Sequence, residues 1–160
     1  MFTGIIENFG TIKRIESRGE GKVLHIACGL DLSESKIGDS IAVNGACLTA
    51  VSLEKNIFKV DMAPETVERT TFKQLRPGSR VNIERALKLS DRIDGHLVSG
   101  HIDGTGVISS IKRNSNAVII RVDVGLKLSA EMIEKGSVAI EGISLIINKC
   151  SDKDASLIDR

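Results

Sequence analysis

An internal duplication is the feature of this sequence that most constrains its fold. The segment TGIIENFGTI at residues 3–12 recurs as SGHIDGTGVI at 99–108, and IAVNGACL at 41–48 recurs as VAIEGISL at 138–145. The distance along the chain between matching segments exceeds the roughly 20–50 residues of solenoid repeats. Each copy is therefore expected to form a domain with its own core. We therefore predict domains over residues 1–94 and 95–160, the second lacking a counterpart of about 62–85.

Short runs of β-branched residues separated by Gly, Asn and Asp predict an all-β fold. In the first copy these runs cover 10–15, 23–28, 40–44, 47–53, 57–62 and 80–84, and in the second 119–124, 138–140, 145–147 and 155–158. Six short strands indicate a small antiparallel barrel, because closure removes exposed strand edges. The prediction is two tandem six-stranded antiparallel barrels, the second incomplete, with a tight turn at Asn44-Gly45.

Helices are expected to be few. The segment 64–72 opens with Pro64 and carries Glu65 in its first turn, which predicts one short helix. The segments 31–36 and 126–135 are further short-helix candidates at matching places in the two copies. The polar segment 89–97 is expected to be the linker.

Composition excludes several classes of function. The net charge is +1 with charges of both signs scattered, and the chain has four Phe but no Trp or Tyr. Neither a basic footprint nor an aromatic stacking platform for nucleic acid is present. No apolar run reaches 18 residues and the first residues do not resemble a signal peptide, so no membrane partner is expected. Three cysteines without metal-type spacing favour free thiols in a cytoplasmic protein.

Two histidines allow alternative interpretations. His96 and His101 lie five positions apart near Asp94 and Asp103. A metal site is one interpretation, but one strand would place two such positions on opposite faces, so we predict no metal. In a second interpretation both are surface histidines of the linker. In a third interpretation His101 acts as an acid, base or hydrogen-bond donor, because it stands where the first copy has Ile5.

Cys47 and Ser144 occupy equivalent places in the two copies, each shortly after a glycine at the start of a strand. Taken singly, the first is explained as a buried small residue and the second as a turn serine. As a pair they indicate two related pockets with different polar groups, since a glycine turn lets a flat ligand approach the main chain.

Several longer motifs carry a family resemblance. They are MFTGII, GDSIAVNGACLTAV, FKVDMAPETVERTTF, VNIERALKLSDRIDGHLVSGHIDG and IEGISL. Together they resemble riboflavin synthase over nearly the whole chain. The resemblance implies two tandem Greek-key barrels, each binding one 6,7-dimethyl-8-ribityllumazine. It also implies a transferase that dismutates two lumazines to riboflavin and 5-amino-6-ribitylamino-pyrimidinedione, with no metal or redox cofactor.

The resemblance also assigns site residues by position. In the first barrel it implies Gly4, Ile5, Ile6, Ser40, Cys47, Leu48, Thr49, Asp61, Met62, Ala63, Pro64, Glu65 and Thr66 as substrate-binding residues. In the second it implies Gly100, His101, Ile102, Lys135, Ser144, Leu145 and Ile146. Ser144, His101 and Cys47 are the expected catalytic residues.

The expected partners follow from the same resemblance. It implies a homo-oligomer, a trimer in the family, with each site between barrels of neighbouring subunits, and lumazine synthase as a candidate partner. The sequence departs from the family at Ile146, where a threonine hydroxyl is lost, and in having no second Pro-Glu-Thr segment and no trimer helix. A lumazine- or flavin-binding protein without turnover, similar to lumazine antenna proteins, is the alternative interpretation.

Overall fold

The chain divides into two compact units. The computed structural model describes residues 1–115, 117–151 and 154–159. The first unit comprises Met1–Ile102 with Ile140–Ile143, and the second comprises Asp103–Ala139 with Ser144–Arg160. The predicted domain boundary after residue 94 lies near this division, but residues 95–102 belong with the first unit.

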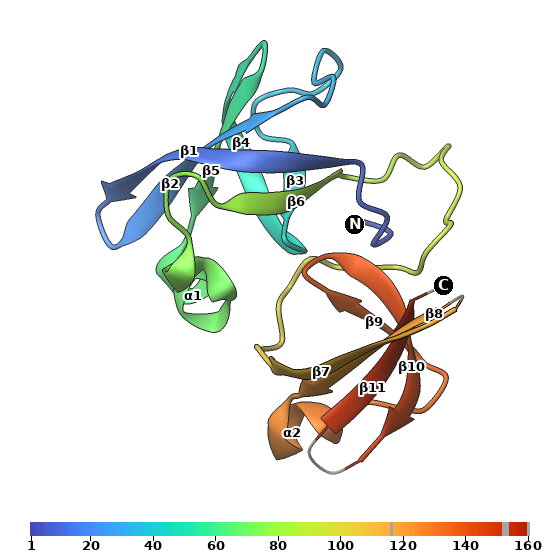
Figure 1. Ribbon diagram of the computed structural model, residues 1–160. Coiled ribbons are helices and arrows are strands. Elements are labelled where there is room, and N and C mark those ends of the chain that lie inside the picture. Colours follow the sequence, from blue (N-terminus) through green and yellow to red (C-terminus); the bar gives the residue numbers. More distant parts are fainter. Residues whose placement is uncertain (116, 152–153, 160) are drawn as a thin grey trace. The chain divides into compact units, whose positions relative to one another are not determined.

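A closed six-stranded antiparallel barrel forms the first unit, as predicted (Figure 1). Its strands are β1 (Asn8–Arg18), β2 (Gly21–Cys28), β3 (Ser40–Val43), β4 (Ala46–Glu54), β5 (Ile57–Met62) and β6 (Arg80–Arg85). The order around the barrel is β1-β2-β5-β4-β3-β6. The consecutive strands β3 to β5 are neighbours and β2 returns beside β5, which is a Greek key.

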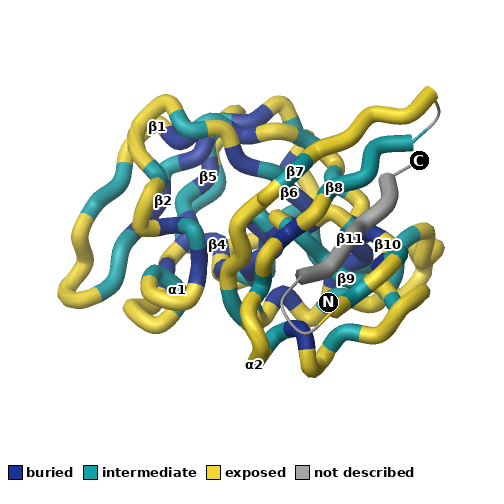
Figure 2. Tube along the Cα trace, turned by 60° about the horizontal axis from the view of Figure 1, so that its bottom comes forward, coloured by how far each residue is buried: buried dark blue, intermediate teal, exposed yellow. Residues whose placement is uncertain are grey.

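The barrel is filled by aliphatic side chains, because alternate residues of each strand point inward. In β4, Leu48 and Ala50 are buried while Thr49 between them is exposed. Figure 2 shows the buried stretches, in dark blue, along the strands and the exposed ones at the turns. The fully buried centre includes Ile12, Leu24, Ile26, Phe58, Val60 and Ile83.

The predicted tight turn between β3 and β4 is confirmed. Asn44 has φ 47° and Gly45 φ 83°, and this pair of left-handed residues matches a type I′ hairpin turn. The equivalent pair in the second copy, Glu141 and Gly142, has φ 49° and 83°. The repeat is therefore visible in backbone conformation as well as in sequence.

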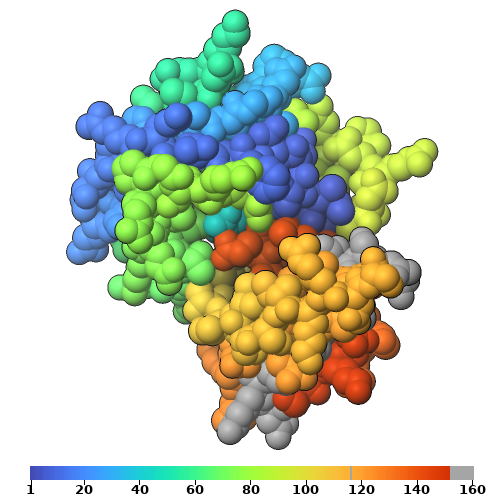
Figure 3. All heavy atoms as spheres, in the orientation of Figure 1, coloured from blue at the N-terminus to red at the C-terminus, as the bar shows by residue number. Residues whose placement is uncertain are grey.

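The helix predictions were less accurate. The segment 64–72 contains α1 (Pro64–Arg69), after which extended backbone at Thr70 separates a 3₁₀ turn, η1 (Thr71–Gln74). The 31–36 prediction was wrong: Asp31 accepts a hydrogen bond from the Ser33 amide at 2.9 Å, a local turn that competes with a helix. In Figure 3 the green atoms of α1, η1 and β6 lie together on the visible face of the first unit.

A five-stranded antiparallel sheet forms the second unit. Its elements are β7 (Val107–Asn114), β8 (Ala117–Asp123), α2 (Gly125–Ser129), β9 (Ser137–Ile140), β10 (Ile143–Cys150) and β11 (Asp154–Asp159). The order β7-β8-β11-β10-β9 repeats that of the first five barrel strands. Strand β7 was not predicted, and α2 is shorter than the predicted 126–135 helix. Among the described residues β7 and β9 have one strand neighbour each, so this copy is an incomplete barrel.

The second unit has a small described core. Of the side chains described there, the buried apolar ones are Val122, Leu145 and Ile147. The cysteines Cys28, Cys47 and Cys150 are free thiols, and burial raises the pKa of Cys28. No helix in the described part of the chain is both long and apolar enough to cross a membrane.

Truncating the centre of the barrel is expected to destabilise it strongly. Phe58 has no exposed surface, so Phe58→Ala should lower the free energy of unfolding by about 3–5 kcal/mol. Phe9, which is 57% exposed and lies under the Arg80 guanidinium, is the matched control. Phe9→Ala should cost about 0.5–1 kcal/mol. Urea unfolding of both variants measures this difference, and equal losses would contradict the assigned core.

Candidate functional site

A row of polar side chains crosses the outer face of three adjacent strands. Ser40 of β3 is paired with Thr49 of β4, and Thr49 is paired with Asp61 of β5. Their sequence neighbours Ile41, Leu48 and Met62 are buried in the barrel, so the row faces outward. We call Ser40, Thr49 and Asp61 the polar row. Paired positions on one face lie about 5 Å apart, so one small ligand can contact all three.

Cys47 extends this face by one position along β4, because residues two apart point to the same side of a strand. It is half-buried, and its pairing partner on β3 is Ala42. Leu48 and Met62, two of the expected site residues, have their side chains in the core, so at the outer surface only their backbone can contact a ligand.

The predicted Pro-Glu-Thr segment follows the polar row directly. Ala63 follows β5 in extended conformation, and Pro64 begins α1. Ala63, Pro64 and Glu65 are exposed and Thr66 is half-buried. Glu65 forms an exposed ion pair with Arg69 at 2.9 Å. The start of α1 therefore continues the surface on which Asp61 lies.

The segment 100–102 also lies beside Cys47 within the first unit. The Cys47 amide donates to the Gly100 carbonyl at 2.9 Å, and Ile102 packs against the barrel core. His101 is exposed, and its amide donates to Ser99 Oγ at 3.2 Å. The sequence-based grouping assigned these residues to the second pocket. In the structure the described contacts of Gly100 and Ile102 are with the first barrel.

The N-terminal residues 2–6 form a further wall of the first unit. Phe2 is fully buried and exchanges backbone hydrogen bonds with Val98, at 2.8 and 3.0 Å. Gly4 has φ 78°, and Ile5 is 46% exposed. The Gly4 turn is held by the buried carboxylate of Glu84, a residue that the sequence did not single out. Strand alternation places Glu84 on the outward face with Asn82, and no sequence signal indicates that it is covered.

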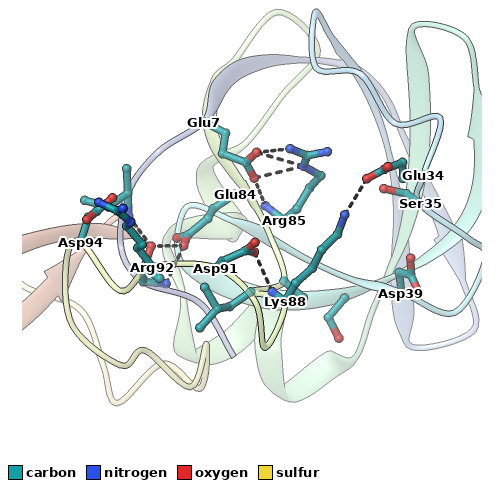
Figure 4. A pocket seen from close by; sticks show the side chains of 15 residues that line it. Glu7, Glu34, Ser35, Asp39, Glu84, Arg85, Lys88, Asp91, Arg92 and Asp94 are labelled. Atoms are coloured by element: carbon teal, nitrogen blue, oxygen red, sulfur yellow. Dashed lines mark hydrogen bonds and ion pairs between the residues drawn. The ribbon is translucent and has the colours of Figure 1, made fainter.

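A polar pocket of about 480 Å³ adjoins this wall (Figure 4). Its lining includes Ile5 and Ser40 of the expected site but not Cys47, Thr49 or Asp61. The charged lining residues are Glu7, Glu34, Asp39, Glu84, Asp91, Asp94, Arg85, Lys88 and Arg92. Hydrogen bonds to Glu7 raise the pKa of Arg85, and the bond to Glu34 raises that of Lys88. This lining of ion pairs suits a polyhydroxylated or charged group rather than a flat ring.

The second unit carries the remaining expected residues on a different surface. Ile146 stands where β4 has Thr49 and is paired with Ile158, where β5 has Asp61. Ile146 is exposed, Ser144 is half-buried and Leu145 is buried. Lys135 has φ 66° and its Nζ donates to Asn148 at 3.1 Å. Two of the three positions of the polar row are thus apolar residues in the second copy.

The histidine alternatives can be compared with the geometry. The His96 amide donates to the Thr3 carbonyl at 3.0 Å, and burial lowers the pKa of its ring against the opposing effect of Glu84. The described residues contain no group of three or more His, Cys, Asp or Glu side chains able to hold a metal ion. His96 is thus half-buried and hydrogen-bonded to the N-terminal wall.

Comparison with known families adds an independent finding. A family model described as the lumazine binding domain matches residues 3–86 and 99–159, the two copies of the repeat. Riboflavin synthase of Bacillus subtilis (strain 168) is 46% identical over 147 residues, which are 92% of this chain and 68% of that protein. The riboflavin synthase of Actinobacillus pleuropneumoniae is 45% identical over 153 residues, which are 96% of this chain and 71% of that protein.

Solved structures agree on the fold. LumP complexed with riboflavin superposes with a TM-score of 0.86 at 23% identity, covering 99% of this chain and 86% of that one. LumP complexed with 6,7-dimethyl-8-(1'-D-ribityl) lumazine gives a TM-score of 0.83 at 24% identity, covering 99% and 85%. At this level of identity the likeness concerns the fold alone.

The contact between Gly100 and Cys47 is expected to be intolerant of a side chain. A Cβ on Gly100 would lie 2.6 Å from Cys47 Cβ and 2.9 Å from Phe2 Cε2, at φ +83°. Gly19 has φ +60° with nothing within 4 Å, so Gly19→Ala measures the conformational cost alone, about 1–2 kcal/mol. Gly100→Ala should lose roughly 1–3 kcal/mol more in denaturant unfolding. Equal losses would show that the segment does not pack on Cys47.

Proposed function

Because this chain belongs to the riboflavin synthase family of lumazine-binding transferases, we propose that it catalyses the dismutation of 6,7-dimethyl-8-ribityllumazine. One lumazine gives a four-carbon unit to a second, which yields riboflavin and 5-amino-6-ribitylamino-pyrimidinedione. The observation that carries the proposal is the polar row beside Cys47 on the first barrel. It offers hydroxyl and carboxylate groups to the edge of a planar heterocycle.

The chemistry matches this inventory of residues. Two identical molecules supply every atom of both products, so the net reaction needs no oxidant, reductant or redox cofactor. The 7-methyl group of a lumazine is acidic because its anion is conjugated with the ring. Catalysis therefore requires two aligned rings, hydrogen bonds to a developing anion and proton transfer, rather than a strong nucleophile.

Within the first barrel, separate groups serve separate parts of the ligand. Thr49 and Asp61 hydrogen-bond the polar edge of the ring, and Gly100, which packs on Cys47, borders the site. Ile5 packs against an apolar part of the ligand. Ser40 lies in both the polar row and the polar pocket, so its hydroxyl contacts the ribityl chain of the ligand.

The proposed catalytic residues are Cys47, His101 and Ser144. Cys47 and His101 belong to the first unit and Ser144 to the second. In line with the family resemblance, we propose that each complete site combines the first barrel of one subunit with the second barrel of a neighbour in a homo-oligomeric trimer. Lumazine synthase is the proposed protein partner, and the free thiols favour a cytoplasmic location.

The direct test follows riboflavin formation by absorbance after mixing the purified chain with 6,7-dimethyl-8-ribityllumazine. Formation of riboflavin is expected, with one pyrimidinedione released per riboflavin. Lumazine binding without turnover would refute the synthase activity and favour a ligand-holding protein. The absence of both binding and turnover would refute the assignment of the polar row as a lumazine site.

Removing one hydroxyl of the polar row should weaken binding measurably. Thr49→Val keeps the shape of the side chain but leaves a ligand polar group unpaired, at a cost of about 1–3 kcal/mol, or roughly 5- to 150-fold in Kd. Thr11→Val in β1, outside the polar row, is the matched control and should leave Kd unchanged. Fluorescence titration with riboflavin measures both values. An unchanged Kd for Thr49→Val would exclude this hydroxyl from the site.

A further inference from the structure

Glu84 is a charged residue buried on the outside of the barrel. Its neighbours Val81 and Ile83 point into the core, so alternation directs Glu84 outward, yet only 5% of its surface is exposed. The N-terminal segment covers it. A buried carboxylate is costly unless it is hydrogen-bonded, and Thr3 and Gly4 of that segment donate three hydrogen bonds to it.

Three donors of the N-terminal turn converge on this carboxylate. Oε1 accepts from the Thr3 amide at 2.5 Å and from Thr3 Oγ1 at 2.8 Å, and Oε2 accepts from the Gly4 amide at 3.1 Å. Thr3 Oγ1 accepts in turn from the Ile5 amide at 3.3 Å. One carboxylate thus holds, directly or through one hydroxyl, three successive amides around the left-handed Gly4.

A second attachment follows three residues later. The Glu7 amide donates to the Ile83 carbonyl at 3.0 Å. The Glu7 carboxylate accepts from the Arg85 amide at 2.6 Å and from its Nη2 at 2.6 Å, as Figure 4 shows. The chain is therefore fastened to β6 on both sides of Ile5 and Ile6. Between the two attachments Ile5 is left 46% exposed.

The same turn holds the segment that reaches Cys47. The Thr3 carbonyl accepts from the His96 amide at 3.0 Å, and Phe2 is paired with Val98. Two residues later, the Gly100 carbonyl accepts from the Cys47 amide. Displacement of the Thr3 turn would therefore move both Ile5 and the segment 96–100.

We propose that Glu84 is a positioning residue for the ligand site: its carboxylate holds the Thr3–Gly4 turn so that Ile5 and the segment 96–100 stand where a ligand on the first barrel meets them. This inference rests on the proposed function for the identity of the ligand. Glu84 itself does not touch the ligand, because its oxygens are taken up by Thr3 and Gly4.

The side-chain charge is essential to this role. All three partners are donors, and a carboxylate only accepts. In Glu84→Gln one oxygen becomes an NH₂ group that faces an amide N–H, so at least one buried donor loses its acceptor. Glu54→Gln is the matched control: the same substitution at a carboxylate that is 59% exposed and ion-paired with Lys59 at 3.6 Å.

The test uses the full chain and two measurements, local amide hydrogen exchange and the Kd for riboflavin. A general loss of stability would not produce the pattern expected for both. Amide hydrogen exchange of residues 3–5 is expected to be at least tenfold faster in Glu84→Gln, with exchange of the β2 and β5 amides unchanged. The Kd for riboflavin, from fluorescence titration, is expected to rise about tenfold. Glu54→Gln should change neither quantity.

The outcomes separate this inference from the proposed function. Unchanged exchange of residues 3–5 would overturn the inference, and so would faster exchange with an unchanged Kd. In both cases a wild-type chain that binds riboflavin keeps the proposed function. A wild-type chain that binds neither riboflavin nor the lumazine overturns the proposed function and with it the binding role of Glu84, while the exchange result still reports on the turn.

A milder variant covers the case in which Glu84→Gln does not fold. Thr3→Val removes the hydroxyl that bridges Glu84 and the Ile5 amide but keeps both backbone donors. Thr3→Ser restores the hydroxyl. We expect faster exchange at Ile5 and a weaker Kd in Thr3→Val, and recovery of both in Thr3→Ser. Weak binding in both variants would show that restoring the hydroxyl does not restore the site, and would contradict the inference.

Discussion

The pairing of β6 with both β1 and β3 is the constraint on which the first unit depends. Asn8 is paired with Ile83 on one edge, and Val43 is paired with Ile83 on the other. This strand closes the barrel, so no edge is left to template aggregation. The same strand carries Glu84 and Arg85, to which the N-terminal wall is fastened. Strand β6 thus both closes the barrel and anchors the wall beside the site.

Most of the fold was predictable because its determinants are local. Alternation of apolar residues located the barrel strands, and Asn44-Gly45 located a turn that the structure confirms. Strand β7 was not located because Ile108, Ser109, Ser110 and Ile111 do not alternate between apolar and polar. The 31–36 helix was wrong because a side-chain hydrogen bond from Asp31 stabilises a turn there. Helix propensity is a weak guide where such local competition exists.

The site was predictable only in part. The residues of the polar row were named from the family resemblance, whereas their alignment across three strands comes from register, which depends on pairing between distant segments. Glu84 could not be found from the sequence, since its burial arises from a segment about 80 residues earlier in the chain. A carboxylate that is outward by alternation and covered by another segment leaves no periodic signal.

The two copies show how one scaffold can be given different chemistry without changing its register. Ile146 and Ile158 are paired in the second sheet as Thr49 and Asp61 are in the first. The backbone positions are therefore equivalent, while the groups offered to a ligand are not. A hydroxyl and a carboxylate can orient a heterocycle by hydrogen bonds, whereas the exposed Ile146 offers only apolar contact. Because the polar row is complete only in the first barrel, only that barrel offers polar side chains at all three positions.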